Sequence, residues 1–412
     1  MGENLRSRLR RIRELRQETD DPGQRAAETG DCAAETKAAV PAPATSEPML
    51  PGAEWAGIGH LTAKRTVTMA APVAAAMPVP VAIPQALGVL VPDMLRYGPV
   101  PPGAGDLVFF DLETTGLSTG PGVVAFLAAF GRLAGEGFRV DQYLLLDYPG
   151  EAGFLEALLG EFAPAAAVPA KKPPPLVVSY NGKSFDSQLL RTRCLMNGFP
   201  PPEFAQADLL HPSRRLWKRT LESCSQASIE TAVLGLDRGG DVPGSMAPDI
   251  WFSFLKTGDP SGLAGVCDHN ARDVFGLLGI FCALCRIAED PFAGGKQFRC
   301  DQGDLALWWR RALRLHGEGA FGPGTAHTGE ALLRTAAEAG HGRAAYAYRR
   351  GLAIEAEWKR KDPASALRQV DLFLALNEIQ GTMADDMLRR RKRLLEKLRQ
   401  KGGPHANPAF KD

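Results

Sequence analysis

The stretch Val108-Phe109-Phe110-Asp111-Leu112-Glu113-Thr114-Thr115-Gly116-Leu117 combines an apolar run with two carboxylates and a turn. Alternate side chains of a strand share a face, so Asp111 and Glu113 point the same way and Leu112 points to the other face. Two buried neighbouring acids repel each other, and a divalent cation is the simplest partner for them. Mg²⁺ and Mn²⁺ prefer such oxygen ligands. The alternative is an edge strand whose acids face water, but the apolar residues before the acids and the turn at Gly116 favour a ligand site.

The composition is that of a globular chain: 412 residues, 45% hydrophobic and 23% charged, long enough for two or three domains. The net charge of +1 means that any basic surface for nucleic acid must be local. Seven scattered cysteines are typical of reduced thiols in the cytoplasm. Cys282 and Cys285 lie in an apolar helical run without a second metal-binding pair, which favours core packing over zinc. No segment is apolar enough for a membrane span or a signal peptide, so we expect a cytoplasmic protein without membrane contact.

The ends of the chain differ in composition from its middle. Residues 1–24 are predicted to form a charged helix, because apolar residues recur at helical spacing among arginines. Residues 25–54 are mostly Ala, Pro, Thr and Glu and are expected to be a disordered linker. We expect residues 55–104 to be an extended lead-in segment and residues 403–412 to be a disordered tail.

The predicted core domain covers residues 105–290. Strand-like runs separated by glycine-bearing turns indicate an antiparallel meander at 107–112, 123–132 and 140–146. An amphipathic helix is predicted at 151–162 and a short buried strand at 176–180. Asn181 to Asp186 follows that strand and opens a helix, an arrangement that aims a carboxylate at a fixed point and leaves helix N-terminal amides free. The alternative is that Asp186 is only favoured there by the helix dipole.

A third acidic segment lies much later in the chain. His269 and Asp273 are four residues apart and therefore share one helical face, with Asp273 at the head of an apolar helix at 275–286. A buried core histidine is the alternative, but the other acids favour a functional site. Between these segments, Arg214, Arg215 and Lys218 form a basic run that suits phosphate contacts, although a solvated helix face is equally ordinary.

The composition changes again after residue 290. Amphipathic helices joined by short breaks are predicted at 304–314, 329–339, 344–361, 363–375 and 384–401. Small alanines at the helix contacts indicate a tetratricopeptide-like array over residues 291–402. The basic run 389–401 could contact nucleic acid or be a solvated terminal helix.

Asp111, Glu113, Asp186 and Asp273 come from three separated segments, and four converging acids suit two divalent cations about 4 Å apart. Such a pair holds a phosphodiester: one ion activates the attacking water and the other stabilises the leaving 3′ oxygen. Without metal the four carboxylates would raise one another's pKa. His269 would be placed to orient or deprotonate the water.

This order of motifs resembles the DEDD exonuclease superfamily, which has a ribonuclease-H-like fold. Asp111-Leu112-Glu113 matches its first motif, D-x-E, and Asn181 to Asp186 matches its second, N-x-x-x-F-D. The third motif is His269-x-x-x-Asp273, with His at the spacing where one branch has Tyr, so the identity of the water-activating residue stays open.

A closer resemblance is to the YprB-like branch of bacterial ribonuclease-H-like proteins. It covers about residues 105–287 well and the C-terminus loosely. The segments that carry it are Asp208-Leu209-Leu210-His211, Arg214-Arg215-Leu216-Trp217-Lys218, Leu221-Glu222-Ser223-Cys224-Ser225, Asp241-Val242-Pro243-Gly244 and His269-Asn270. That branch tends to carry a helical C-terminal part.

The resemblance implies an α/β fold: a ribonuclease-H-like mixed sheet flanked by helices, joined to an all-α C-terminal region. The implied activity is a 3′–5′ exonuclease with two Mg²⁺ or Mn²⁺ ions, acting on single-stranded DNA or RNA. Thr114, Thr115, Gly116 and Leu117 would contact the terminal nucleotide, and Asn181 would support the strand. Arg214, Arg215 and Lys218 are added as phosphate contacts.

The main alternative is a catalytically inactive scaffold that binds nucleic acid through the same fold. In a second alternative, the C-terminal helices bind a protein partner and the nuclease domain is vestigial. No motif separates DNA from RNA, because that choice depends on contacts to the 2′-hydroxyl. Exonuclease and endonuclease activity, the oligomeric state and the role of residues 1–104 also stay open.

Overall fold

The computed structural model describes residues 49–69, 82–96, 102–116, 120–134, 137–162, 175–236, 238–376 and 381–401. The predicted helix at 1–24, most of the predicted linker at 25–54, the tail at 403–412 and Leu117 lie outside these ranges. The described residues belong to one compact unit. In the described ranges, no helix is both long and apolar enough to cross a membrane.

Among the described residues, seven strands form one mixed sheet in the order β1-β2-β5-β4-β3-β6-β7. Their bounds are β1 Ala56–Gly59, β2 Thr62–Met69, β3 Leu107–Thr114, β4 Ala125–Ala134, β5 Gly137–Leu145, β6 Leu176–Ser179 and β7 Ala205–Asp208. Strands β3, β4 and β5 pair antiparallel, which confirms the predicted meander. Strand β6 pairs parallel with both β3 and β7. Part of the lead-in segment forms β1 and β2 at the edge of the sheet.

Helices cover both faces of this sheet. Helices α4 (Glu151–Phe162), α5 (Asp186–Met196) and α8 (Ala247–Thr257) pack in one apolar cluster with the even-numbered residues of β3. The other cluster joins the odd-numbered residues of β3 to α3 (Leu87–Leu90) and to most of α9 (Leu263–Glu289). Alternation along β3 therefore decides which layer each side chain enters.

Helix α9 packs against β3 and β4. It begins at Leu263, so the prediction that Asp273 stands at the head of this helix is wrong. The prediction failed because polar residues between 268 and 273 interrupt the apolar pattern. In the structure the helix continues through them, and several of them face the candidate site. Close packing with the sheet requires Gly131, where a Cβ atom would overlap Phe138 and Val274. Cys282 and Cys285 are fully buried in this helix, which confirms core packing.

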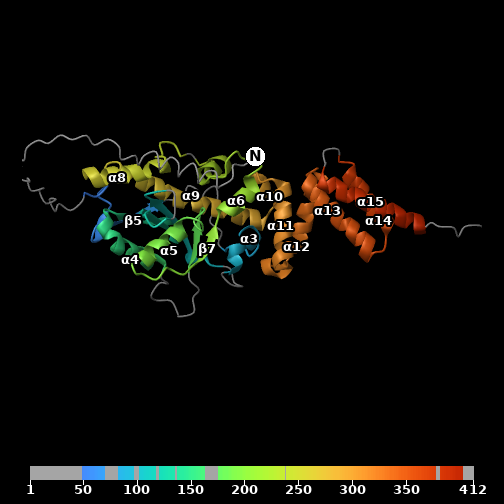
Figure 1. The fold of residues 1–412 in the computed structure, drawn as a ribbon, viewed down its shortest axis with the longest axis horizontal. Helices are drawn as coiled ribbons and strands as arrows, with labels where there is room; N and C mark the ends of the chain where they lie inside the picture. The colour runs from blue at the N-terminus through green and yellow to red at the C-terminus, as the bar shows by residue number, and fades with distance from the viewer. Residues whose placement is uncertain are drawn as a thin grey trace, which may run out of the picture. The chain divides into compact units, whose positions relative to one another are not determined.

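Short helices follow β7: α6 (Leu210–Trp217), α7 (Gln226–Ile229), a π-helical turn (Glu230–Leu234), and α10 (Ala293–Gln297) after α9. The five predicted C-terminal helices are confirmed and succeed one another along the chain (Figure 1). They are α11 Gln302–His316, α12 Thr325–Glu338, α13 Gly342–Ile354 with a π-helical extension to Lys359, α14 Pro363–Leu374 and α15 Thr382–Lys401.

The C-terminal helices do not share a single core. Apolar residues of α11 and α12 belong to the same buried cluster as the sheet and α9. The later helices build a separate cluster around Val370, Phe373 and Leu394. The indole nitrogen of Trp308 on α11 also donates to the carbonyl of Val89, 2.5 Å away. Helix α11 is therefore fixed against the core that carries the sheet.

Candidate active site

The end of β3 supplies two carboxylates on one face. Phe109 is buried against α9, and Asp111 and Glu113 follow it on the same face, while Leu112 is buried on the opposite side. Both acids line a cavity of about 330 Å³ together with Thr114 and Gly116. The predicted common orientation of the two acids is confirmed.

The turn after β3 uses its two threonines differently. The hydroxyl of Thr114 donates to the carbonyl of Gly116 at 2.8 Å, and both residues line the cavity. The hydroxyl of Thr115 instead accepts the backbone N–H of Val124 at 2.9 Å, and Thr115 does not line the cavity. The turn is therefore held by its own side chains, which positions the backbone beside the acids.

The loop between β6 and α5 brings in the next acid. Asp208, buried at the end of β7, accepts the backbone N–H of Asn181 at 2.8 Å and that of Lys183 at 3.1 Å. Asn181 has a φ of 65°, a left-handed conformation that Asn tolerates better than most residues. Asn181, Phe185 and Asp186 all line the cavity. The loop thus places Asp186, the first residue of α5, opposite the acids of β3.

Helix α9 closes the site with three polar residues, His269, Asn270 and Asp273. The Nε2 atom of His269 lies 3.3 Å from an oxygen of Asp273 and 4.0 Å from an oxygen of Glu113. One ligand atom from each of these three residues lies within 4.8 Å of the other two. The side-chain N–H of Asn270 donates to Asp111 at 2.8 Å. The side chain of Asn270 is fully buried and accepts a bond of 2.9 Å from Gln142, which fixes its orientation.

Two residues that the sequence analysis did not assign to the site complete this side of it. Asp241 contacts Nδ1 of His269 at 2.9 Å. Arg238 lies 2.5 Å from Asp273 and 2.5 Å from Glu230. The turn that begins at Asp241 was visible in the sequence, but its contact with His269 was not. Nothing in the local sequence points to Arg238, because its partners are 8 and 35 residues away.

Negative charge on the acids of the cavity is disfavoured when no cation is bound. Burial, together with repulsion by Asp273, Asp186 and Glu113, raises the pKa of Asp111 well above its ordinary range. Burial, together with repulsion by Asp273, Asp186 and Asp241, raises the pKa of Glu113 to about 8. Burial and Asp208 raise the pKa of Asp186 to about 7.

The negative charge of Asp273 is partly compensated by neighbouring residues. Burial raises its pKa, and the nearby His269 and Arg238 oppose that rise. The other three acids have no arginine or lysine within ion-pair distance among the described residues. A site with several buried oxygen donors and an excess of negative charge fits hard divalent cations such as Mg²⁺ or Mn²⁺.

The predicted phosphate-binding residues are placed elsewhere. Arg214, Arg215 and Lys218 come together on and just after α6, but they do not line the acidic cavity. They line a second depression, between α6 and α11. The structure therefore separates the predicted site residues into an acidic cavity and a basic groove.

Comparison with known proteins agrees with this architecture. Residues 108–285 match a family described as RNase_H superfamily. The chain is also 36% identical over 184 residues to the uncharacterized protein YprB of Bacillus subtilis (strain 168). That match covers 44% of this chain and 42% of the relative, so it spans less than half of either protein. The fold is thus ribonuclease-H-like, and over this domain the chain is similar to the YprB branch of the RNase_H superfamily.

Proposed function

We propose that this protein is a metal-dependent 3′–5′ exonuclease that hydrolyses phosphodiester bonds of single-stranded nucleic acid. The observation that carries the proposal is the meeting of acids from three distant segments. Asp111, Glu113 and Asp186 line one cavity and have raised pKa values, and Asp273 lies beside Glu113 and His269. A ribonuclease-H-like fold supports a nuclease class. The DEDD subtype, the polarity and the preference for single strands rest on the motif resemblance.

In this proposal the four acids Asp111, Glu113, Asp186 and Asp273 would hold two divalent cations. The ions would supply Lewis-acid stabilisation of the phosphodiester and lower the pKa of a water molecule. The protein's own contribution is orientation. Asn270 holds Asp111 by a hydrogen bond of 2.8 Å, and Asp241 holds His269 by one of 2.9 Å.

His269 is the residue we assign to the water. Its Nδ1 is engaged by Asp241, while its Nε2 points between Glu113 and Asp273. A histidine held through one ring nitrogen can accept or position a proton at the other. Thr114 and Gly116 line the same cavity and are proposed to contact the terminal nucleotide, as is Thr115 through the backbone of its turn. Asn181 lines the cavity too and is proposed to support the substrate strand.

An inactive scaffold is the second candidate, and one observation favours it. Arg238 neutralises Asp273 from within the protein at 2.5 Å, which is the role that a cation would otherwise play. In that case the acidic cavity would bind no metal, and the fold would only hold nucleic acid or a protein partner.

A cleavage assay separates the two candidates. We would incubate a 5′-labelled single-stranded oligonucleotide with the full chain and Mn²⁺ or Mg²⁺, and expect a ladder that shortens from the 3′ end. EDTA should stop the reaction, and Asp111→Asn should abolish it while binding is largely kept. Asp249→Asn is the matched control, because Asp249 is exposed on α8 and does not line the cavity.

The substrate ends test the polarity. A circular single strand has no 3′ terminus, so an exonuclease should leave it intact. Cleavage of the circle would contradict the exonuclease assignment while leaving the nuclease assignment in place. If neither substrate is cut with either metal, and the metals do not raise the melting temperature, the scaffold is the better description.

A further inference from the structure

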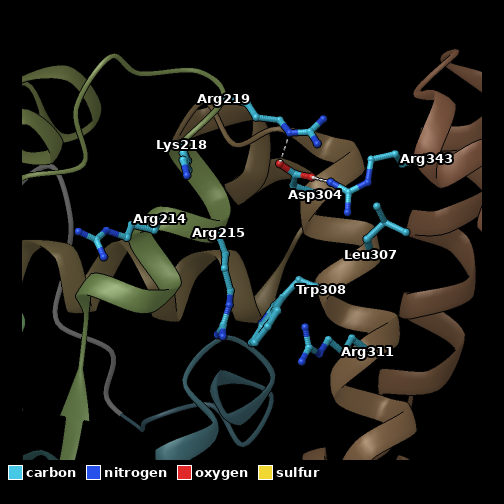
Figure 2. Close-up of a pocket in the computed structure, with 9 residues that line it drawn as sticks. All are labelled: Arg214, Arg215, Lys218, Arg219, Asp304, Leu307, Trp308, Arg311 and Arg343. Carbon is cyan, nitrogen blue, oxygen red and sulfur yellow. Dashed lines mark ion pairs between the residues drawn. The ribbon is translucent and has the colours of Figure 1, made fainter. Parts of the chain in front are cut away.

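The basic groove lies between α6 of the sheet domain and α11 of the C-terminal helices. Its volume is about 540 Å³. Figure 2 shows that Arg215 lies beside Trp308 and that Arg219 reaches toward Asp304, while Arg214 extends away from α11. They are Arg214, Arg215, Lys218, Arg219, Asp304, Leu307, Trp308, Arg311 and Arg343.

The two walls of the groove are held together by buried contacts. The indole nitrogen of Trp217 on α6 donates to the carbonyl of Phe298 at 2.7 Å, and the N–H of Asp301 donates to the carbonyl of Leu216 at 3.2 Å. Trp217 is fully buried in the cluster that also contains residues of α11. The groove is therefore a fixed feature of the fold.

Positive charge in the groove exceeds negative charge by a wide margin. Among the described lining residues there are six cations and a single carboxylate, Asp304. Asp304 is already engaged by Arg219 at 3.0 Å and by Arg343 at 3.8 Å, and Figure 2 marks both ion pairs. The other four cations form no ion pair within the part of the chain that the structure describes. Such an arrangement is unfavourable without an anion, because like charges repel at short range.

Arg215 is the most constrained of these cations. Its guanidinium carbon lies 3.5 Å from the centre of the Trp308 ring, which is cation–π stacking. Burial and the neighbouring Arg311 lower the pKa of Arg215. A guanidinium held flat on a ring keeps its N–H edge free, and that edge matches the oxygens of a phosphate. Because Arg215 covers this face of Trp308, the groove is better suited to phosphates than to stacked bases.

The groove is also tied to the acidic cavity through one carboxylate. Asp208 accepts the N–H groups of Asn181 and Lys183 in the loop of the cavity, and it accepts the N–H of Leu210, the first residue of α6, at 3.0 Å. Tyr180 lines the acidic cavity, and Arg214 is close enough to act on its hydroxyl electrostatically. A strand that leaves the cavity past Tyr180 would thus meet Arg214 at the entrance of the groove.

We infer that the groove between α6 and α11 binds the sugar–phosphate backbone of the nucleic-acid strand beyond the scissile end. This inference rests on the proposed function for the identity of its ligand. It assigns the C-terminal helices a direct part in substrate binding, because α11 provides Trp308 and Arg311 and the next helices provide Arg343. The substrate site would then be built from both regions of the chain.

Binding without cleavage tests this inference. A fluorescein-labelled dT20 strand would be titrated with the full chain in EDTA, and the anisotropy followed at 50 to 200 mM salt. Arg311→Ala should weaken binding about fivefold, and the salt slope should fall by about 0.7, as expected for the loss of one phosphate contact. Arg311 is exposed and unpaired among the described residues, so its removal should not disturb folding.

Charge reversal and a matched control sharpen the result. Arg215→Glu with Arg311→Glu should weaken binding at least thirtyfold, since two attractions become repulsions. Arg314→Ala removes the same charge from the same helix outside the groove and should change binding by less than twofold. Unchanged binding in the folded double variant would overturn the inference, as would tighter binding of poly-glutamate than of dT20.

The outcome is separable from that of the proposed function. If dT20 binds through the groove but no strand is ever cleaved, the groove assignment stands and the exonuclease assignment fails. If strands are cleaved while Arg311→Ala and the double variant bind dT20 like the unmodified chain, the exonuclease assignment stands and the groove assignment fails.

Discussion

Replacing Glu113 by Gln should stabilise the metal-free protein. The carboxyl of Glu113 is largely buried, and burial with repulsion by neighbouring acids raises its pKa to about 8. A folded pKa above the unfolded value of about 4.5 means that the folded chain binds a proton where the unfolded chain has lost it. The stability that depends on Glu113 therefore falls as pH rises from about 4.5 to about 8. Gln carries no titrating group and escapes this loss.

The size of the effect follows from the same shift. A change in pKa from 4.5 to about 8 corresponds to about 5 kcal/mol above pH 8 and about 3 kcal/mol at pH 7. The new amide must find hydrogen-bond partners in the cavity, and an unsatisfied amide costs about 1 to 2 kcal/mol. We therefore expect Glu113→Gln to gain about 1 to 2 kcal/mol at pH 7 and more at pH 8.5. At pH 5 the variant should be slightly less stable than the unmodified chain.

Thermal unfolding in EDTA at pH 5, 7 and 8.5 measures this change of sign in the stability difference between the variant and the unmodified chain. Glu156→Gln is the control, because Glu156 is exposed on α4, and its stability difference should be small at every pH. Excess Mn²⁺ should reverse the order at pH 7, since a cation that binds only the folded chain stabilises it and Gln is a poorer ligand. A stability difference that does not change with pH would refute the reasoning, because it would show that Glu113 titrates normally.

Three further predictions concern other parts of the fold. Asn270→Leu removes the donor that holds Asp111, so the Mn²⁺ concentration for half-maximal cleavage should rise about 10- to 100-fold. Glu357→Gln should lower the free energy of unfolding by about 3 kcal/mol at pH 7, because it leaves the buried Arg390 without its partner. Although burial opposes it, hydrogen bonds from cations of α15 lower the pKa of Glu357 to about 2, so this difference should shrink as pH falls from about 4.5 toward 2. Gly131→Ala should cost about 1 to 3 kcal/mol in chemical denaturation, since the added methyl group overlaps two core side chains.

Local patterns explain why most of the fold could be predicted. The alternation along β3 is a property of adjacent residues, and it placed Asp111 and Glu113 together correctly. The start of α9 could not be found in this way. Residues such as His269 and Asn270 look like a helix boundary when polar side chains are assumed to face solvent, but here they face a buried site. Polar residues of a buried functional site therefore obscure the apolar pattern from which the helix that carries them would be predicted.

Tertiary contacts explain what was missed at the site. Arg238 and Asp241 reach α9 from a connecting loop, and no periodicity links them to His269 or Asp273. The basic run after β7 could be recognised in the sequence, but the sequence does not show which part of the fold these side chains face. Since Asp208 caps the start of α6, that helix carries Arg215 away from the acids and toward α11.

Arg238 makes the four acids unequal, and this inequality has a consequence for the order in which they would hold cations. Glu230 anchors Arg238 at 2.5 Å, so the arginine is held beside Asp273 whether or not a cation is present. Among the described residues, neither Asp111 nor Glu113 has an arginine or lysine partner, and burial and repulsion by neighbouring acids raise their pKa values. A first cation should therefore gain most from the two acids of β3, because there it relieves the larger repulsion. Asp273 would bind a cation only if Arg238 moved away from it. The cation site beside α9 would therefore be the weaker of the two.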